Sequence, residues 1–569
     1  MSETMSKPSM KRVLPAFVMV VFVIFFTNDL VEQLLLWAIG VTVPLTLCLT
    51  ETRNRLGQID RVYQWCWRSY PWCAGLGAAS FLLPKGNLAG LLSVPWLVFT
   101  VVVAVYGCKR LLERNRHALE ELAMDCGLLY LAIGGGWLAA SRFGMPVLHF
   151  SEEIVALTGI HFHYSAFVVP IFVGLLGRAV DWRAQFPLRY RLMSVGVITG
   201  PMLVAMGITF STVLEFVAVV WFVGALLLYT ALLLPVVWKR EQRGGIRALF
   251  LLSSVTIWGT MALSVIYSLG RMMQISFFTI EEMVLLHGIA NAFGFVTAGA
   301  WAWCASLPPA RGLLSGIPHS LLAAKGRIGA DILTRLGWVD EARCVRGLVD
   351  DFADFARPDF DPDAVHPSIR SFYEDTLAYR LEAKIEWQKG FRLFSAWFSR
   401  LTGRIGQCHL PSAGEKVTEM NSRLAAVKEA CDGRVAPRAW VRTYAGTGRT
   451  VFVAVYSIHT LAEETYMNIA LPFPGGNLTG VLRLEHGTGA KGKSDGLVLT
   501  SIQGVKPGDQ GLYWTSRWGL VVLPLRERFH VWVDEEGRMK AEHEMWIWKW
   551  RFLHIHYQLI REEAAQGKP

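Results

Sequence analysis

The chain lacks any cysteine pattern typical of a zinc ribbon or a disulfide-stabilised domain. Its 569 residues include nine cysteines, but no CxxC pair and no regular spacing. Both kinds of domain need repeated, closely spaced cysteines. The sequence therefore favours reduced thiols in a protein core or a bilayer.

Signatures of nucleotide, calcium and nucleic-acid binding are also missing. The glycine run 134–136 does not follow a strand, as a phosphate-binding loop would, and we interpret it as a close contact between helices. The acidic stretch 359–363 lacks the glycine and the distal glutamate of an EF-hand loop. The net charge of +10 comes, in the first half, from basic residues between apolar runs. These residues indicate membrane topology, so no nucleic-acid partner is expected.

Long apolar runs are abundant in the first half of the chain. Hydrophobic residues make up 53% of the sequence, and runs of about 20 apolar residues, the length that crosses a bilayer as a helix, recur before Pro308. Residues 1–308 therefore predict an α-helical polytopic membrane domain of about ten transmembrane helices, with the lipid bilayer as partner. The predicted spans are 13–30, 32–50, 70–84, 88–107, 123–141, 160–177, 192–210, 212–238, 248–270 and 281–304.

Basic residues in the predicted loops set the expected orientation. With the N-terminus inside, nineteen Lys and Arg lie in the inner loops and three in the outer loops. Since a cytoplasmic excess is the rule, we expect a multi-pass protein of the cell membrane with both its N- and C-termini in the cytoplasm.

Three of the predicted spans begin on the outer side with ionisable residues, a costly placement that usually marks function. We therefore expect an outer-leaflet His/Glu cluster, in which His163 and His287 meet across two spans. The expected catalytic or transport residues are His163, His287 and Glu215, and the expected substrate contacts are His161, Asn291 and Glu282.

Several chemistries fit such a cluster. A metal ion or haem would take neutral imidazole from His161, His163 or His287, a proton or ion path would use carboxylates and imidazoles, and a hydrolase or transferase would use a general base. On a regular helix His161 and His163 point about 200° apart, so both reach one ion only if the backbone departs from a helix there. The alternative is a non-catalytic, membrane-anchored binding or interaction protein with structural histidines.

Two stretches of the membrane half carry a family resemblance. The residues His161-Phe162-His163-Tyr164-Ser165-Ala166-Phe167, and His287-Gly288 followed by Asn291-Ala292-Phe293-Gly294-Phe295, resemble the signature stretches of the YndJ family of multi-pass bacterial membrane proteins. The resemblance covers roughly the fifth to the tenth predicted span. It implies a membrane location and singles out these stretches, and the family supplies no established activity.

The second half of the chain has an ordinary soluble composition. Residues 309–405 predict a cytoplasmic helical segment that includes helices at 366–387 and 391–404. The second of these is basic and amphipathic. It fits either an anionic membrane surface or a cover for the domain behind it, and the covering role is favoured.

After about Ala436 the hydrophobic period changes to two, so residues 406–569 predict a cytoplasmic domain with a mostly antiparallel, barrel-like or helix-grip sheet. A buried aromatic face is expected at Trp546, Trp548, Trp550 and Phe552. It continues into His554 and His556, for which no third metal ligand is evident. Such a sheet either encloses a lipid or other apolar ligand or has a filled core. The predicted strands are 438–445, 450–458, 463–471, 479–486, 496–502, 511–515, 518–524, 527–533, 539–550 and 552–560.

These patterns predict an integral membrane protein of unknown activity. Its His/Glu cluster would act on, or move, a small or lipidic substrate, and its cytoplasmic β-rich domain would bind an apolar ligand.

Overall fold

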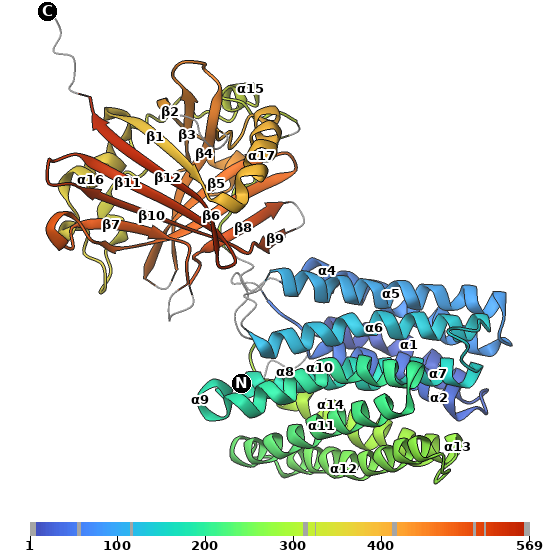
Figure 1. Cartoon of the computed structure of the whole chain (residues 1–569). Coiled ribbons are helices and arrows are strands. Elements are labelled where there is room, and N and C mark those ends of the chain that lie inside the picture. The colour runs from blue at the N-terminus through green and yellow to red at the C-terminus, as the bar shows by residue number, and fades with distance from the viewer. Residues whose placement is uncertain are drawn as a thin grey trace, which may run out of the picture. The chain divides into compact units, whose positions relative to one another are not determined.

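The chain divides into two compact units, Met1–Leu313 and Leu314–Pro569. The first is a helical bundle and the second is built on β-strands (Figure 1), which confirms the predicted fold class. The structure, a computed structural model, describes residues 7–53, 59–113, 118–310, 317–324, 326–411, 418–461, 463–503, 508–516 and 519–562.

Eight helical segments of the first unit are long and apolar enough to cross a bilayer, within the residues that the structure describes. The two remaining predicted spans correspond to α1 and α4, and α4 carries Arg61 and Arg68. The structure therefore supports eight of the ten predicted spans. They are Leu30–Cys48, Asn87–Leu112, Leu119–Phe143, Glu152–Ala179, Pro187–Phe210, Thr212–Arg240, Gly244–Met273 and Ile280–Ala305.

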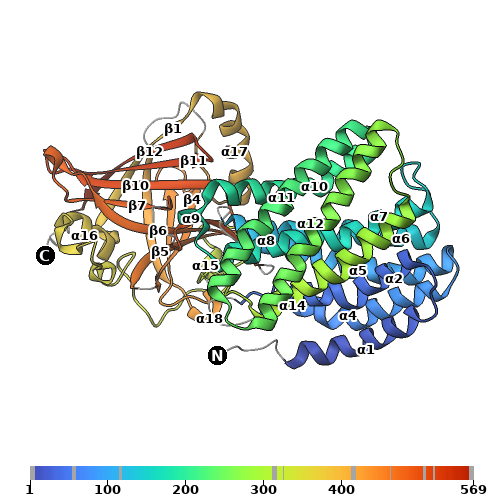
Figure 2. The ribbon, with the colours of Figure 1, turned by 90° about the horizontal axis from the view of Figure 1, so that it is seen from below.

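The helices of this unit pack mainly against their neighbours in the chain, as α10, α11 and α12 do (Figure 2). Three segments marked η1, η3 and η4 are π-helical. The helices are α1 (Lys7–Ile24), α2 (Leu30–Trp37), η1 (Ala38–Thr42), α3 (Val43–Cys48), α4 (Arg61–Ala79), η2 (Ser80–Leu82), α5 (Asn87–Leu112), α6 (Leu119–Phe143), α7 (Glu152–His161), η3 (Phe162–Ala166), α8 (Phe167–Ala179), α9 (Trp182–Gln185), α10 (Pro187–Phe210), α11 (Thr212–Arg240), α12 (Gly244–Met273), α13 (Ile280–Met283), η4 (Val284–Thr297) and α14 (Ala298–Ala305).

The helix that carries His161 and His163 begins earlier than predicted. Ser151 is its N-cap, accepting from the backbone N–H of Ile154, and α7 starts at Glu152. Acidic residues favour the first turn of a helix, although the sequence pattern assigned them to a loop. At 1.5 Å per residue, His163 lies about 16 Å along the helix rather than at its start.

The second unit is an antiparallel barrel of ten strands. Its order is β5-β4-β3-β2-β1-β12-β11-β10-β7-β6, and pairing between β5 and β6 closes it, while β8 and β9 extend from β6. The strands are β1 (Tyr379–Trp387), β2 (Thr418–Ala426), β3 (Arg438–Tyr444), β4 (Thr450–Leu461), β5 (Glu464–Phe473), β6 (Gly476–Gly487), β7 (Gly496–Thr500), β8 (Gly511–Ser516), β9 (Gly519–Val522), β10 (Leu525–Val533), β11 (Met539–Ile547) and β12 (Trp550–Arg561).

All ten predicted strands are present, but β1 and β2 were not predicted. The predicted helix at 366–387 is wrong beyond Glu374, where α16 (Pro367–Glu374) ends, because β1 takes up 379–387. Burial alternates along β1 with a period of two and its outward positions are charged, which is the pattern of a strand that is buried on one face. The segment 309–405 therefore holds short helices, a barrel strand and α17 (Arg392–Ile405), together with α15 (Ile332–Arg335), η5 (Phe352–Phe355), η6 (Pro362–Ala364), η7 (Thr376–Ala378) and η8 (Lys389–Phe391).

The prediction of a buried aromatic face on the last hairpin is wrong at Trp548 and Trp550. Strand β11 ends at Ile547 and Trp548 has a positive φ of 53°, so the chain turns there. Trp548 and Trp550 are 54% and 65% exposed. The buried positions of β12 are Leu553, Ile555, Tyr557 and Leu559.

Candidate functional site

His163 is fully buried, and both of its ring nitrogens are hydrogen-bonded. Nε1–H of Trp96 donates to Nε2 of His163 at 3.1 Å, and Nδ1 donates to the carbonyl of Gly159 at 2.8 Å. The Trp96 and His163 rings also stack. This geometry requires the Nδ1–H tautomer and uses the lone pair of Nε2, so a metal ion would have to displace Trp96. The contacts favour a packing role for His163.

His287 of η4 packs against α12. Its Nδ1 is 3.1 Å from the Ser264 hydroxyl and 3.1 Å from the Thr260 carbonyl on α12, whereas His161 donates to its own helix at Leu157. Within the described residues, His163 and His287 share no hydrogen-bond partner.

The other predicted site residues have partners of their own. Glu215 is buried and lies 3.5 Å from Arg271 of α12. Oδ1 of Asn291 accepts from the Thr260 hydroxyl. Glu282 forms a capping box with Thr279 at the start of α13. His287, Asn291 and Glu215 thus each contact α12, whereas His161 bonds to its own helix and Glu282 caps α13.

The two signature stretches lie on π-helical segments, with α2 and η1 beside both. Tyr164 of η3 donates to the carbonyl of Leu34, and Trp37 donates to the Thr297 hydroxyl of η4. π-helical turns are rare and often occur at functional sites. The sequence pattern did not predict them, because a membrane helix that is apolar on most faces offers little period from which to distinguish the two helix types.

Gly134 of α6 packs directly against the His163 ring, and its missing side chain leaves the space that this ring occupies. A Cβ built there would lie 2.9 Å from His163 Nδ1, and one at Gly135 would meet the Thr100 hydroxyl, whereas Gly136 has open space. The predicted close helix packing of this glycine run is therefore confirmed at two of three positions.

We expect Gly134→Val to destabilise the membrane unit by about 1–3 kcal/mol, the usual cost of overpacking a core. Gly136→Val is the matched control, since it adds the same side chain one residue away into open space. Thermal unfolding of both variants in the same detergent measures the difference. Equal melting temperatures would contradict the assigned contact.

A buried ion-pair network joins α5, α6 and α8, and the sequence pattern missed it. Nε of Arg110 is 2.5 Å from Oδ1 of Asp125, and Nη2 of Arg110 is 3.1 Å from Oε2 of Glu121. Glu121 also binds Arg178 at 2.7 and 2.8 Å. All four side chains are at most 3% exposed. Both arginines also count as topology signals in the sequence, where acidic residues beside the predicted span at 123–141 point to partners for them.

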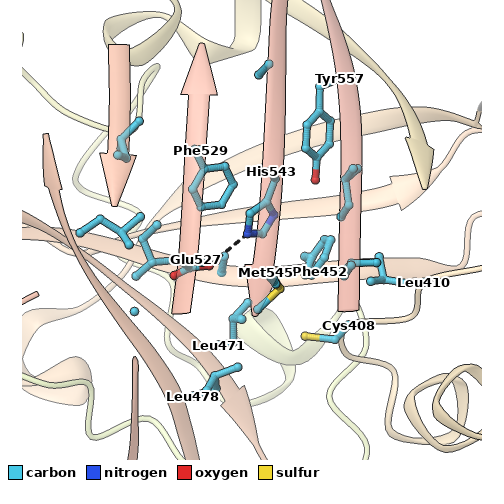
Figure 3. A pocket seen from close by; sticks show the side chains of 18 of the residues that line it. Cys408, Leu410, Phe452, Leu471, Leu478, Glu527, Phe529, His543, Met545 and Tyr557 are labelled. Carbon is cyan, nitrogen blue, oxygen red and sulfur yellow. Dashed lines mark hydrogen bonds and ion pairs between the residues drawn. The ribbon is translucent and has the colours of Figure 1, made fainter. Parts of the chain in front are cut away.

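The barrel contains a cavity of about 420 Å³ (Figure 3). Its wall is almost wholly aliphatic and aromatic. The inward residues of β10 and β11 include Phe529 and Met545, and Phe452 and Leu471 come from β4 and β5. This volume lies within the roughly 300–1,000 Å³ typical of small-molecule sites.

Arg442 of β3 lines this cavity without a polar partner. Its Cζ lies 4.4 Å from the Trp440 ring centroid and 4.5 Å from that of Phe452. The residue is 9% exposed, and it makes no hydrogen bond or ion pair within the described part of the chain. Nε of Arg442 and Nε1 of Trp440 are both buried donors without acceptors. Leaving such groups unpaired is costly.

The cavity contains one further polar pair, on the wall across from β3. Nε2 of His543 is 3.2 Å from Oε2 of Glu527 (Figure 3), and Phe529 stacks on the imidazole at 3.7 Å. Burial raises the pKa of the Cys408 thiol to about 12, although Arg442 acts in the opposite direction. The thiol is therefore neutral and supplies no anion to Arg442.

Helix α17 covers the cavity, as the favoured interpretation of the sequence predicted. Phe394 and Phe398 of α17 line the cavity and contact Trp387 of β1. The other face leaves Leu393 and Trp397 exposed, at 92% and 58%. One helix thus presents apolar side chains both to the cavity and outward.

Comparison with known proteins matches a family model to the membrane unit and a relative to most of the chain. The family model described as YndJ-like protein matches residues 33–295. The uncharacterized membrane protein YndJ of Bacillus subtilis (strain 168) is 35% identical over 494 residues, which cover 86% of this chain and 86% of the relative. No solved structure gave a significant match. The chain therefore belongs to the YndJ-like family of membrane proteins.

Proposed function

We propose that this membrane protein binds an amphiphile with one apolar chain and an anionic head group inside its C-terminal barrel. The observation that carries the proposal is the apolar cavity of the barrel with Arg442 on its wall, since this guanidinium has no hydrogen-bond or ion-pair partner among the described residues. A cavity lined by aliphatic and aromatic side chains favours an apolar ligand. A guanidinium without a partner binds a carboxylate or phosphate in a bidentate fashion.

The polar groups of the cavity support an anionic rather than a neutral head group. Trp440 Nε1–H stands two residues from Arg442 on the same strand face and offers a further donor. Glu527 is held by His543, and no carboxylate of the described residues lies within ion-pair distance of Arg442. The ligand then supplies the acceptors that the barrel lacks.

The membrane helices anchor the barrel to a bilayer, which is the source of the ligand in this proposal. The loop charges favour a cytoplasmic barrel. The contacts of His163 support a structural role for that residue, so the proposal places ligand binding in the barrel. It assigns no reaction to the predicted catalytic set of His163, His287 and Glu215.

Photolabelling of the full chain in phospholipid nanodiscs tests the proposal. A diazirine-bearing C16 carboxylic acid should label peptides of the barrel wall, such as those containing Phe529 and Ile555, in addition to membrane helices. Ala541→Phe places a ring in the cavity and should abolish the barrel labels, whereas Ala364→Phe on the surface should leave them. Labels confined to the membrane helices in the parent chain would overturn the proposal.

A further inference from the structure

The outer surface of the barrel carries histidine and glutamate side chains on three adjacent strands. His554 and His556 alternate with the inward residues of β12 and lie on the same outer face. Glu386 of β1 pairs with His554 on one side, and Glu542 of β11 pairs with His556 on the other. The cluster is separate from the cavity, whose lining includes none of these four residues.

The spacing of these groups suits one metal ion. Ligand atoms of Glu386, His554 and His556 all lie within 4.8 Å of one another. Nε2 of His556 is 3.7 Å from Oε2 of Glu386. Zinc–ligand bonds of about 2.0–2.2 Å place neighbouring ligands of a tetrahedral site roughly 3.3–3.6 Å apart. Small side-chain shifts therefore bring the three groups into range.

The partners of these ligands orient them. Oε1 of Glu542 is 3.5 Å from Nδ1 of His556, and Nζ of Lys384 is 2.7 Å from Oε1 of Glu386. A carboxylate beside one imidazole nitrogen fixes the tautomer and directs the other lone pair to a metal. Lys384 occupies one oxygen of Glu386 and leaves Oε2 for the ion.

One donor of the cluster also lacks a hydrogen-bond partner. Cross-strand ion pairs explain some of the spacings, and Nε2 of His554 lies 3.7 Å from Oε2 of Glu542. This distance is longer than a hydrogen bond, so the buried Nε2 of His554 has no hydrogen-bond partner among the described residues.

We propose that Glu386, His554 and His556 bind a divalent transition-metal ion, for which Zn²⁺ fits the two nitrogen donors and one oxygen donor. Water completes the coordination, as in zinc sites with three protein ligands. Glu542 is a positioning residue that orients His556. The site does not depend on the cavity ligand.

Metal titration of the full chain, purified without a polyhistidine tag, tests this site. We expect one equivalent of Zn²⁺ to remain after dialysis, and one equivalent of Co²⁺ to give tetrahedral d–d absorption. His556→Ala and Glu386→Gln should each abolish stoichiometric binding. Glu542→Gln should weaken binding about 10- to 100-fold, as other partners of metal-bound histidines do.

His149→Ala is the control, because this exposed histidine lies in the membrane unit and should leave the metal content unchanged. Zn²⁺ should raise the melting temperature of the parent chain but not that of His556→Ala, which separates loss of the site from loss of the fold. Substoichiometric binding by the parent chain, or binding by His556→Ala equal to that of the parent, would overturn the proposal.

Discussion

Glu121→Gln is expected to destabilise the membrane unit by about 3–5 kcal/mol, the usual cost of breaking a buried ion pair. Glu121 accepts from the guanidinium groups of both Arg110 and Arg178, at distances of 2.7–3.1 Å. Asp125 still pairs with Arg110, but the amide cannot neutralise Arg178, so one positive charge remains unpaired in a buried site. Melting temperature and the yield of monodisperse protein both measure the loss.

Glu153→Gln is the matched control for this substitution. Glu153 also lies in the first turn of a membrane helix but is exposed, so its replacement should change stability by less than about 0.5 kcal/mol. If Glu121→Gln melts within the error of the parent protein, the network does not hold α5, α6 and α8 together.

Arg442→Gln is expected to lower the affinity of the barrel for an acidic amphiphile by about 10- to 150-fold, because hydrogen bonds to charged groups contribute about 1.5–3 kcal/mol. The matched C16 diazirine alcohol should label parent and variant equally. Arg449→Gln, on an exposed hairpin of the same sheet, is the control and should retain the preference for the acid.

The same substitution should leave the melting temperature unchanged or raise it, since it removes a buried cation that has no partner in the described protein. A role of Arg442 in folding alone predicts the reverse, a loss of stability. Equal labelling of the parent barrel by acid and alcohol would contradict the assignment of an anionic head group. It would still support binding of an apolar chain in the cavity. Absence of barrel labels would remove both.

The barrel was largely predictable because its strands alternate with a period of two and are separated by turn residues. The turn at Asp534 and Gly537 joins β10 to β11 as expected, with Val533 opposite Met539. Strand β1 was not predicted as a strand although its burial alternates, because it follows α16 closely and its Leu, Glu, Ala and Lys residues favour a helix by propensity. The predicted spans were placed on apolar runs. The predicted span at 160–177 therefore left out the start of α7, including its acidic first turn.

The site was less predictable, because its determinants are contacts between distant segments. His163 was singled out as an ionisable residue at membrane depth, but its partner Trp96 lies 67 residues away. Arg442 carried no motif. Its significance comes from facing a cavity in which no described acidic residue pairs with it, a property of the closed barrel that no local pattern contains.

Electron cryomicroscopy of the full chain in lipid nanodiscs tests the barrel assignment most directly. The proposal predicts elongated density within the barrel, running between Phe529 and Met545 on one wall and Phe452 on the other, with one end within hydrogen-bond distance of the Arg442 guanidinium. A barrel interior filled by repacked side chains, or density that ends away from Arg442, would contradict it.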